Sequence, residues 1–235
     1  VLGTTLVLKG ATHERLIDPL GVVYSHRSSD GLWLPGGASS TGAGVVAEKF
    51  SGCDLNALNQ NAAAAGPSDL VVYPLSGKGE RFPFSAPEAE GFVIGTPVDI
   101  ESLYVGILQG VAFIERLAFE YLEMLGAPIE GKLTFTGGAT KSAVWNQIRA
   151  NVLGREVSIP EVTEGAFGMA VLAASHDCSL VEATRAMVRT RKAISPMRSL
   201  QDAYTERYAR LLQELQFRGW ISERIVEHAR TRTAA

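Results

Sequence analysis

The chain has 235 residues, of which 46% are hydrophobic and 20% are charged, and its formal net charge is −3 at pH 7. This composition is typical of a globular protein with one large domain or two small ones. The weak negative charge argues against an electrostatic partner such as nucleic acid, and we expect none. We also expect no membrane partner, because charged residues interrupt the most apolar stretch, 100–125.

The positions of the cysteines and histidines argue against a disulfide or a metal site. Cys53 and Cys178 are far apart in sequence, form no CxxC pair and do not cluster with the four histidines. We therefore expect no structural disulfide and no metal site built from protein side chains. This usage fits a reducing, cytoplasmic location.

The first 50 residues predict three short strands, at 1–9, 21–26 and 32–36, and then a helix at about 43–50. Turn-forming residues separate the strands, which favours an antiparallel meander. The first strand contains Gly3-Thr4-Thr5, whose hydroxyls and amides could donate to phosphate oxygens. Threonine is also an ordinary strand residue, so this motif alone does not indicate a site.

The rest of the chain predicts mainly helices. Residues 51–98 read as irregular with a short helix at 54–64, and the strongest apolar periodicity predicts a helix over 99–125. Elements then alternate: strand 132–136, helix 142–153, strand 156–160 and helix 165–175. Two more helices, 179–189 and 199–217, precede a basic stretch that reads as a solvated helix end and a frayed tail.

The strongest functional signal is the strand-to-helix turn at Gly137-Gly138-Ala139. Glycines let the backbone approach a ligand closely, and the first amides of the following helix have no intrahelical partner. Such a turn suits a nucleotide, with Trp145 one turn into the helix, where it could pack beside an adenine. An ordinary strand-to-helix connection would explain the same residues.

Several motifs in combination resemble the carboxy-terminal domain of the FGGY carbohydrate kinases. They are Gly3-Thr4-Thr5, the segments 34–42 and 109–113, Thr136 to Ser142, Trp145, Ile148, and the segments 153–155 and 164–168. The resemblance covers about residues 1–175. It implies an α/β actin-like ATPase (ribonuclease H-like) domain of order βββαβαβα over 1–235, with a core at about 1–175 and a helical extension at about 176–235.

The resemblance assigns phosphate-binding roles near the start of the chain. Gly3, Thr4 and Thr5 would face the β- and γ-phosphates. Gly42 and Gly44 would lie near the nucleotide at the start of a helix. No catalytic residue is expected in this chain, because the general-base aspartate of the family would lie upstream of residue 1. We expect an amino-terminal sugar-binding domain to be absent from the chain.

The resemblance also implies which residues contact the adenosine part of the nucleotide. Gly138 and Ala139 would line the adenosine and α-phosphate, and Ser142 and Trp145 would flank the adenine. Many relatives carry Asn where this chain has Ser142, and serine can make fewer hydrogen bonds to a base.

The segment Gly21 to Gly42 looks most like the ribulokinase/xylulokinase-like branch of the family. The implied function is therefore the nucleotide-binding half of an ATP-dependent sugar kinase for a ketopentose such as D-ribulose or D-xylulose. ATP would be the cosubstrate, with Mg²⁺ held mainly by its phosphates. The sugar would bind mostly to the amino-terminal domain. This fragment alone would be inactive, and a homodimer is a further possibility.

Other functions stay open. The sugar or polyol could be glycerol, gluconate, rhamnulose or fuculose, or the chain could be a non-catalytic actin-like nucleotide-binding module. Acetate kinase-like and heat-shock ATPase-like proteins of the same superfamily are nearer alternatives than a dinucleotide-binding oxidoreductase, for which a GxGxxG turn is lacking. The carboxylates Asp30, Asp69, Asp99 and Glu164 are expected to be structural.

Overall fold

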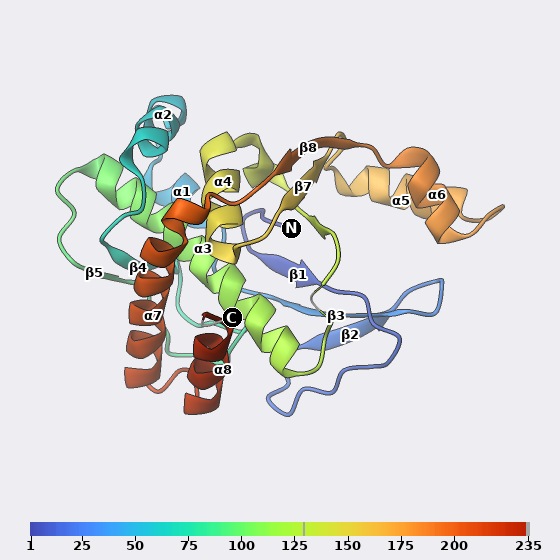
Figure 1. Ribbon diagram of the computed structural model, residues 1–235, viewed down its shortest axis with the longest axis horizontal. Coiled ribbons are helices and arrows are strands. Elements are labelled where there is room, and N and C mark those ends of the chain that lie inside the picture. The colour runs from blue at the N-terminus through green and yellow to red at the C-terminus, as the bar shows by residue number, and fades with distance from the viewer. Residues whose placement is uncertain (129, 234–235) are drawn as a thin grey trace.

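A computed structural model describes residues 1–128 and 130–233 of the chain (Figure 1). The first sheet contains β1 (Val7–Lys9), β2 (Tyr24–Arg27) and β3 (Trp33–Ala38). All neighbours are antiparallel, but their order is β1–β3–β2, so the predicted meander is wrong: the long β1–β2 connection allows β3 to take the central place. The predicted strand 1–9 is also divided, since only its last part is β1.

Two helices and a small sheet follow. Helices α1 (Gly44–Lys49) and α2 (Leu55–Ala65) confirm the predicted ones, and Asp54 caps α2 by accepting from two backbone amides. Strands β4 (Val71–Tyr73) and β5 (Phe92–Ile94), which pair antiparallel, are not predicted by the sequence. Each has three residues, too few for a strand period to stand out from the surrounding turn formers.

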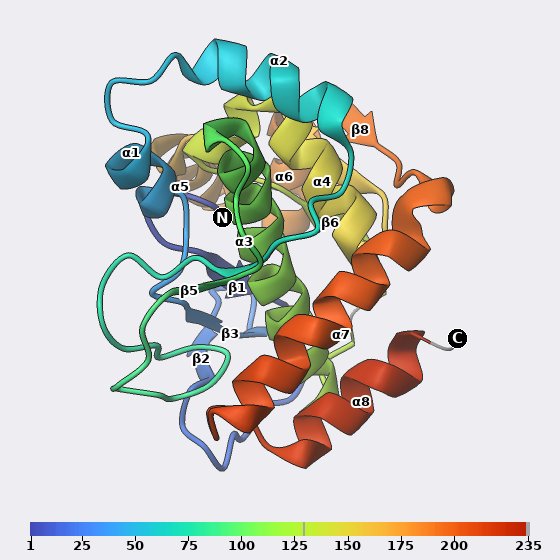
Figure 2. The same ribbon diagram turned by 90° about the vertical axis from the view of Figure 1, so that its left-hand side faces the viewer.

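Helix α3 (Ile100–Met124) runs through the centre of the molecule (Figures 1 and 2). A capping box between Asp99 and Ser102 fixes its start. The helix is long and apolar enough to cross a membrane, but 78% of its most apolar window is buried inside the fold, as in a core helix. A Cβ on Gly110 would lie 2.2 Å from the Val72 carbonyl oxygen, so this glycine lets strand β4 approach.

The second sheet contains β6 (Leu133–Thr134), β7 (Val157–Pro160) and β8 (Thr190–Ile194), in the order β6–β7–β8. Strands β6 and β7 are parallel, and their crossover consists of the short 3₁₀ helix η1 (Gly138–Lys141) and helix α4 (Ala143–Leu153). Strand β8 runs antiparallel to β7 and was not predicted. Four of its five residues are exposed, so it shows no apolar pattern.

A buried ion pair joins α3 to α4. The Arg149 guanidinium donates to both carboxylate oxygens of Glu115, at 2.7 and 2.6 Å, and both side chains are almost fully buried. The same guanidinium lies over the Phe135 ring, 3.5 Å from its centroid. Because Phe135 directly follows β6, these contacts fix helix α4 against the strand that leads into the Gly-Gly turn.

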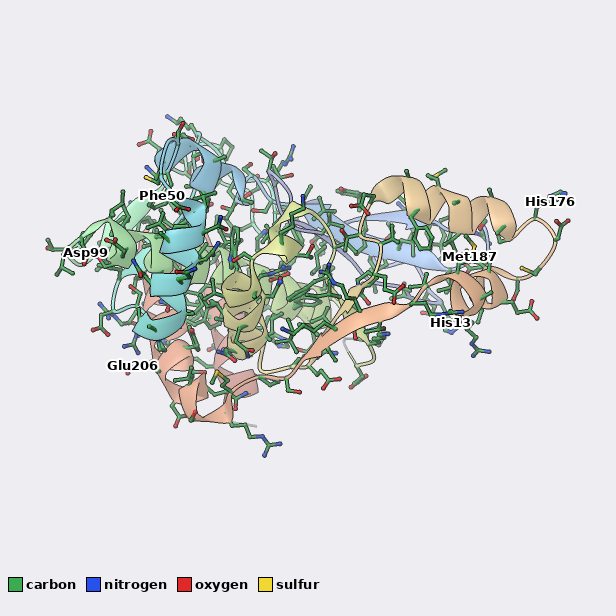
Figure 3. The ribbon with its side chains drawn as sticks, turned by 90° about the horizontal axis from the view of Figure 1, so that it is seen from above. His13, Phe50, Asp99, His176, Met187 and Glu206 are labelled. Carbon is green, nitrogen blue, oxygen red and sulfur yellow. The ribbon has the colours of Figure 1, made fainter. Side chains whose placement is uncertain are left out.

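Helices α5 (Gly165–Ala174) and α6 (Leu180–Met187) pack against each other beyond the second sheet and form an arm at one end of the molecule. In Figure 3, His176 and Met187 lie in this arm, at the opposite end from Asp99. Val171 is the buried residue of α5, although the helix is almost entirely apolar, and Met169 is 64% exposed.

The last helices are α7 (Gln201–Phe217), which follows the 3₁₀ turn η2 (Arg198–Leu200), and α8 (Glu223–Thr233). They lie side by side (Figure 2), and α7 packs against β4 while α8 packs against α3. Tyr208, Leu211 and Leu215 join the same core as α3. The expectation of a frayed tail is wrong, because Ile225, Val226 and Ala229 of α8 are buried. Strand β8 and helices α7 and α8 therefore complete the second sheet and the core.

Candidate functional site

The first seven residues form a tight hairpin. Val1 and Val7 exchange two hydrogen bonds, at 2.7 and 2.8 Å, and Leu2 pairs with Leu6. Both leucines are fully buried, which anchors the two arms of the hairpin. The turn is Gly3-Thr4-Thr5, with Thr4 exposed at its tip. The motif therefore lies at a turn instead of inside a strand, with Thr5 partly exposed beside Thr4.

The glycine-rich loop after β3 lies directly on this turn. The amides of Ala43 and Gly44 donate to the carbonyl oxygens of Gly3 and Thr4, at 2.8 and 3.0 Å. A Cβ on Gly42 would lie 2.4 Å from the Thr4 oxygen, and one on Gly44 would lie 2.9 Å from the Thr4 methyl group. Only glycine fits this contact at position 42, so the loop is built to approach the hairpin.

The Gly-Gly turn contacts the other side of the same hairpin. The Leu2 amide donates to the Thr136 carbonyl oxygen at 2.9 Å, and the Ala139 amide donates to the Leu2 carbonyl oxygen at 3.2 Å. Gly137 has φ +93°, and a Cβ there would lie 2.5 Å from the Leu2 carbonyl oxygen. Gly138 is exposed, and a Cβ there would meet nothing within 4 Å.

These three segments bring seven of the nine predicted nucleotide-binding residues to one place: Gly3, Thr4, Thr5, Gly42, Gly44, Gly138 and Ala139. The surroundings of these seven residues differ. A Cβ on Gly3 or Gly138 would meet nothing within 4 Å, so these two positions border open space that a ligand can approach. Gly42 is buried, and the Ala139 side chain is only 8% exposed, so both support the turns.

Ser142 and Trp145 have structural partners at the start of α4. The Ser142 hydroxyl accepts from the Trp145 amide and donates to Asn59 of α2 at 2.7 Å. A pocket of about 760 Å³ opens between α2 and α4, lined in part by Asn56, Asn59, Lys141 and Ser142. Ser142 is thus an N-cap at the edge of a pocket.

The Trp145 ring is not accessible to a ligand. It is 4% exposed, and its indole nitrogen donates to the Leu108 carbonyl of α3 at 3.0 Å. The expectation that Trp145 flanks an adenine is therefore revised: its ring belongs to the core and fixes α4 on α3. The sequence could not distinguish the buried face of a helix from a face that meets a ligand.

The other charged residues weighed from the sequence have protein partners. Asp30 accepts from the Leu32 amide in a turn, and Asp69 pairs with Arg207. Glu164 directly precedes α5, but its side chain does not cap that helix. Within residues 1–128 and 130–233, no group of three or more histidine, cysteine or acidic side chains could hold a metal ion.

Glu80 also lies beside this site, and the sequence does not reveal it. Its side chain is 3% exposed and accepts hydrogen bonds from residues 39–41, just before the glycine-rich loop. Its segment, rich in turn formers, read as an irregular surface loop, and nothing in the sequence indicates that its carboxylate points inward.

Comparison with known proteins identifies the family and the fold. The sequence profile of the FGGY family of carbohydrate kinases, C-terminal domain, matches residues 1–176. The probable L-xylulose kinase of Haemophilus influenzae is 28% identical over 229 residues, covering 91% of this chain and 44% of that protein. The gluconokinase of Bacillus subtilis is 22% identical over 182 residues, covering 69% of this chain and 35% of that protein.

A solved structure shows the same fold. The xylulose kinase of Rhodospirillum rubrum superposes with a TM-score of 0.76 at 25% identity, covering 92% of this chain and 46% of that one. The likeness confirms the α/β actin-like ATPase fold. The chain spans less than half the length of these relatives. Since the profile match extends over well more than half of the residues, the chain belongs to the FGGY family of carbohydrate kinases and corresponds to its C-terminal domain.

Proposed function

We propose that this chain is the nucleotide-binding part of an ATP-dependent sugar kinase. The observation that carries the proposal is the convergence of the Gly3-Thr4-Thr5 turn, the glycine-rich loop 42–44 and the turn at Gly138, which leaves open space at Gly3 and Gly138. Turns of small residues that present the hydroxyls of Thr4 and Thr5 beside open space suit phosphate groups. Family membership supports the kinase class, and the match to less than half of the relatives supports a role as one part of the enzyme.

In this proposal, Thr4 and Thr5 face the β- and γ-phosphates, and Gly138 lines the α-phosphate and ribose. The adenine lies toward the pocket beside Ser142, where the amide side chains of Asn56 and Asn59 could bind a heterocycle. Mg²⁺ would be held mainly by the phosphates and would offset their negative charge.

The task of these residues is to position the γ-phosphate, because phosphoryl transfer depends mainly on alignment and electrostatics. We propose that the catalytic base and most of the sugar site lie outside this chain, so the chain alone transfers no phosphate. A ketopentose of the xylulose or ribulose type is the proposed substrate, supported by the relatives that are named xylulose kinases. The similarity to a gluconokinase makes gluconate the second candidate. A cytoplasmic location accompanies the proposal.

Calorimetric titration of the 235-residue chain with Mg-ATP, Mg-ADP and AMP tests the nucleotide site. Saturable binding is expected, with AMP weaker than the other two nucleotides because it lacks the phosphates that the hairpin would contact. Thr4→Val should weaken Mg-ATP binding, whereas Thr96→Val, an exposed control before α3, should not. Equal affinity for AMP and ATP, or an unchanged Thr4→Val variant, would contradict the phosphate assignment. Phosphorylation of xylulose by this chain alone would contradict the placement of the base.

A further inference from the structure

Glu80 is a buried acceptor for five hydrogen bonds. One carboxylate oxygen accepts from the hydroxyls of Ser39, Thr41 and Tyr73, at 2.9, 3.2 and 2.9 Å. The other oxygen accepts from the backbone amides of Ser40, at 2.6 Å, and of Arg81. A carboxylate in a buried place is costly unless hydrogen bonds replace its water, and here donors surround it.

These bonds join two parts of the fold. Tyr73 ends β4 and packs against the rings of Phe84, Phe92 and Trp220, so it belongs to the core. Residues 39–41 belong to the link between β3 and the glycine-rich loop. Within that link, the Thr41 amide also donates to the Ser39 hydroxyl at 2.9 Å. One carboxylate thus connects a rigid aromatic cluster to the link.

The link leads directly into the candidate nucleotide site. The Thr41 carbonyl accepts from the Leu6 amide at 2.8 Å, and the next residues, Ala43 and Gly44, bond to the Gly3-Thr4-Thr5 turn. Since Gly42 fits against the hairpin without room for a Cβ, a shift of residues 39–41 must be passed on to the turn.

We infer that Glu80 is a positioning residue for the nucleotide site: it holds the link 39–41 so that the glycine-rich loop and the Gly3-Thr4-Thr5 turn stay in the arrangement that receives the phosphates. This inference rests on the proposed function for its ligand. The arrangement of the loop itself can be tested without any nucleotide.

The first test is amide hydrogen exchange of the 235-residue chain without ligand. Glu80→Gln keeps the shape of the side chain but presents an NH₂ group where three hydroxyls now donate. Exchange at the Ala43 and Gly44 amides should become faster by about tenfold or more in this variant. The Val22 and Val23 amides, which are bonded to another carboxylate, should keep their exchange rates relative to the global unfolding limit.

The matched control is Asp18, a second carboxylate with similar chemistry. It accepts from the Leu20, Val22 and Val23 amides and from the Tyr121 hydroxyl, and it connects the β1–β2 loop to the C-terminal half of α3. Asp18→Asn should lower the unfolding midpoint and leave the exchange of the Ala43 and Gly44 amides, after correction for global stability, unchanged.

The second test measures Mg-ATP affinity. Glu80→Gln and Ser39→Ala should raise the Kd by about tenfold, whereas Asp18→Asn and Tyr73→Phe should change it less than about twofold. Tyr73→Phe removes a donor on the core side of Glu80 and leaves its bonds to the link, so it separates stability from positioning.

The outcomes distinguish the inference from the proposed function. If Glu80→Gln loosens Ala43 and Gly44 but the wild-type chain binds no nucleotide, the role of Glu80 stands as the anchor of the loop and the proposed function fails. If the wild type binds Mg-ATP and Glu80→Gln affects affinity and local exchange no more than Asp18→Asn does at the same loss of stability, the positioning role is overturned.

Discussion

The adjacent residues Gly137 and Gly138 give the sharpest test of the site, because they are chemically identical and have opposite surroundings. At Gly137, φ is +93° and ψ is 172°, a conformation that is essentially restricted to glycine. A Cβ at this position would lie 2.5 Å from the Leu2 carbonyl oxygen, whereas a Cβ on Gly138 would meet nothing within 4 Å.

Gly137→Ala should therefore act on stability. The backbone strain costs about 1–3 kcal/mol. The contact with Leu2 also disturbs two hydrogen bonds, from Leu2 to Thr136 and from Ala139 to Leu2, each contributing about 0.5–1.5 kcal/mol. The free energy of unfolding should fall by about 2–6 kcal/mol, and Tm by at least about 4 °C.

Gly138→Ala should act on binding. Its unfolding free energy should stay within about 1 kcal/mol of wild type, because the new methyl group meets no atom of the protein. The methyl group would occupy the space through which the nucleotide approaches, so the Kd for Mg-ATP should rise by at least about tenfold, or about 1.4 kcal/mol. Urea unfolding and calorimetry measure the two quantities. A Gly138→Ala chain that binds Mg-ATP like wild type would refute the location of the site.

Three further predictions concern the scaffold. Ser142→Ala removes the N-cap of α4 and should cost about 0.5–2 kcal/mol in urea unfolding, and Ser142→Asn, which also caps, should restore most of it; equal loss in both variants would contradict the capping role. Arg149→Met leaves the buried Glu115 carboxylate unpaired and should cost about 3–5 kcal/mol, far more than Lys78→Met at an exposed pair; similar small losses would show that the buried pair is not essential. Burial and the nearby Glu120 carboxylate raise the pKa of Tyr208 well above 10. The contribution of Tyr208 to the free energy of unfolding is therefore fully present below pH 10 and is lost at higher pH, where this tyrosine ionises in the unfolded chain first. Unfolding free energy should fall by about 1.4 kcal/mol per pH unit above about pH 10 for this residue, and Tyr208→Phe should make the measured slope shallower; an unchanged slope would contradict this assignment.

The sequence predicts best where a pattern is long and local. Helix α3 follows from apolar residues at helical spacing over 25 positions, and its N-terminal capping box lies within four residues. Strand β8 could not be predicted in this way, because four of its five residues are exposed and its position depends on pairing with β7, at least 30 residues away. Short strands of this kind are fixed by tertiary partners.

In the candidate site, too, the sequence predicts local features and does not predict those that depend on distant residues. The turn with small side chains at 137–139 is evident from the sequence, whereas residues 3–5 were expected inside a strand and form the tip of a hairpin. The sequence does not show why positions 42 and 137 are glycine, because the backbone atoms that exclude a Cβ belong to the hairpin at the start of the chain. Trp145 and Glu80 show the limit most clearly: one was expected to meet the ligand and is buried, and the other was read as part of a loop and supports the site.

The hydrogen bonds between Leu2 and residues 136–139 also constrain how the protein folds. They close a loop of more than 130 residues, and such distant contacts form late because the entropy of closing the loop must be overcome first. Partly folded states in which the hairpin is undocked would therefore lack the proposed phosphate cradle. A ligand that binds only the complete cradle should slow unfolding while leaving the rate of refolding almost unchanged.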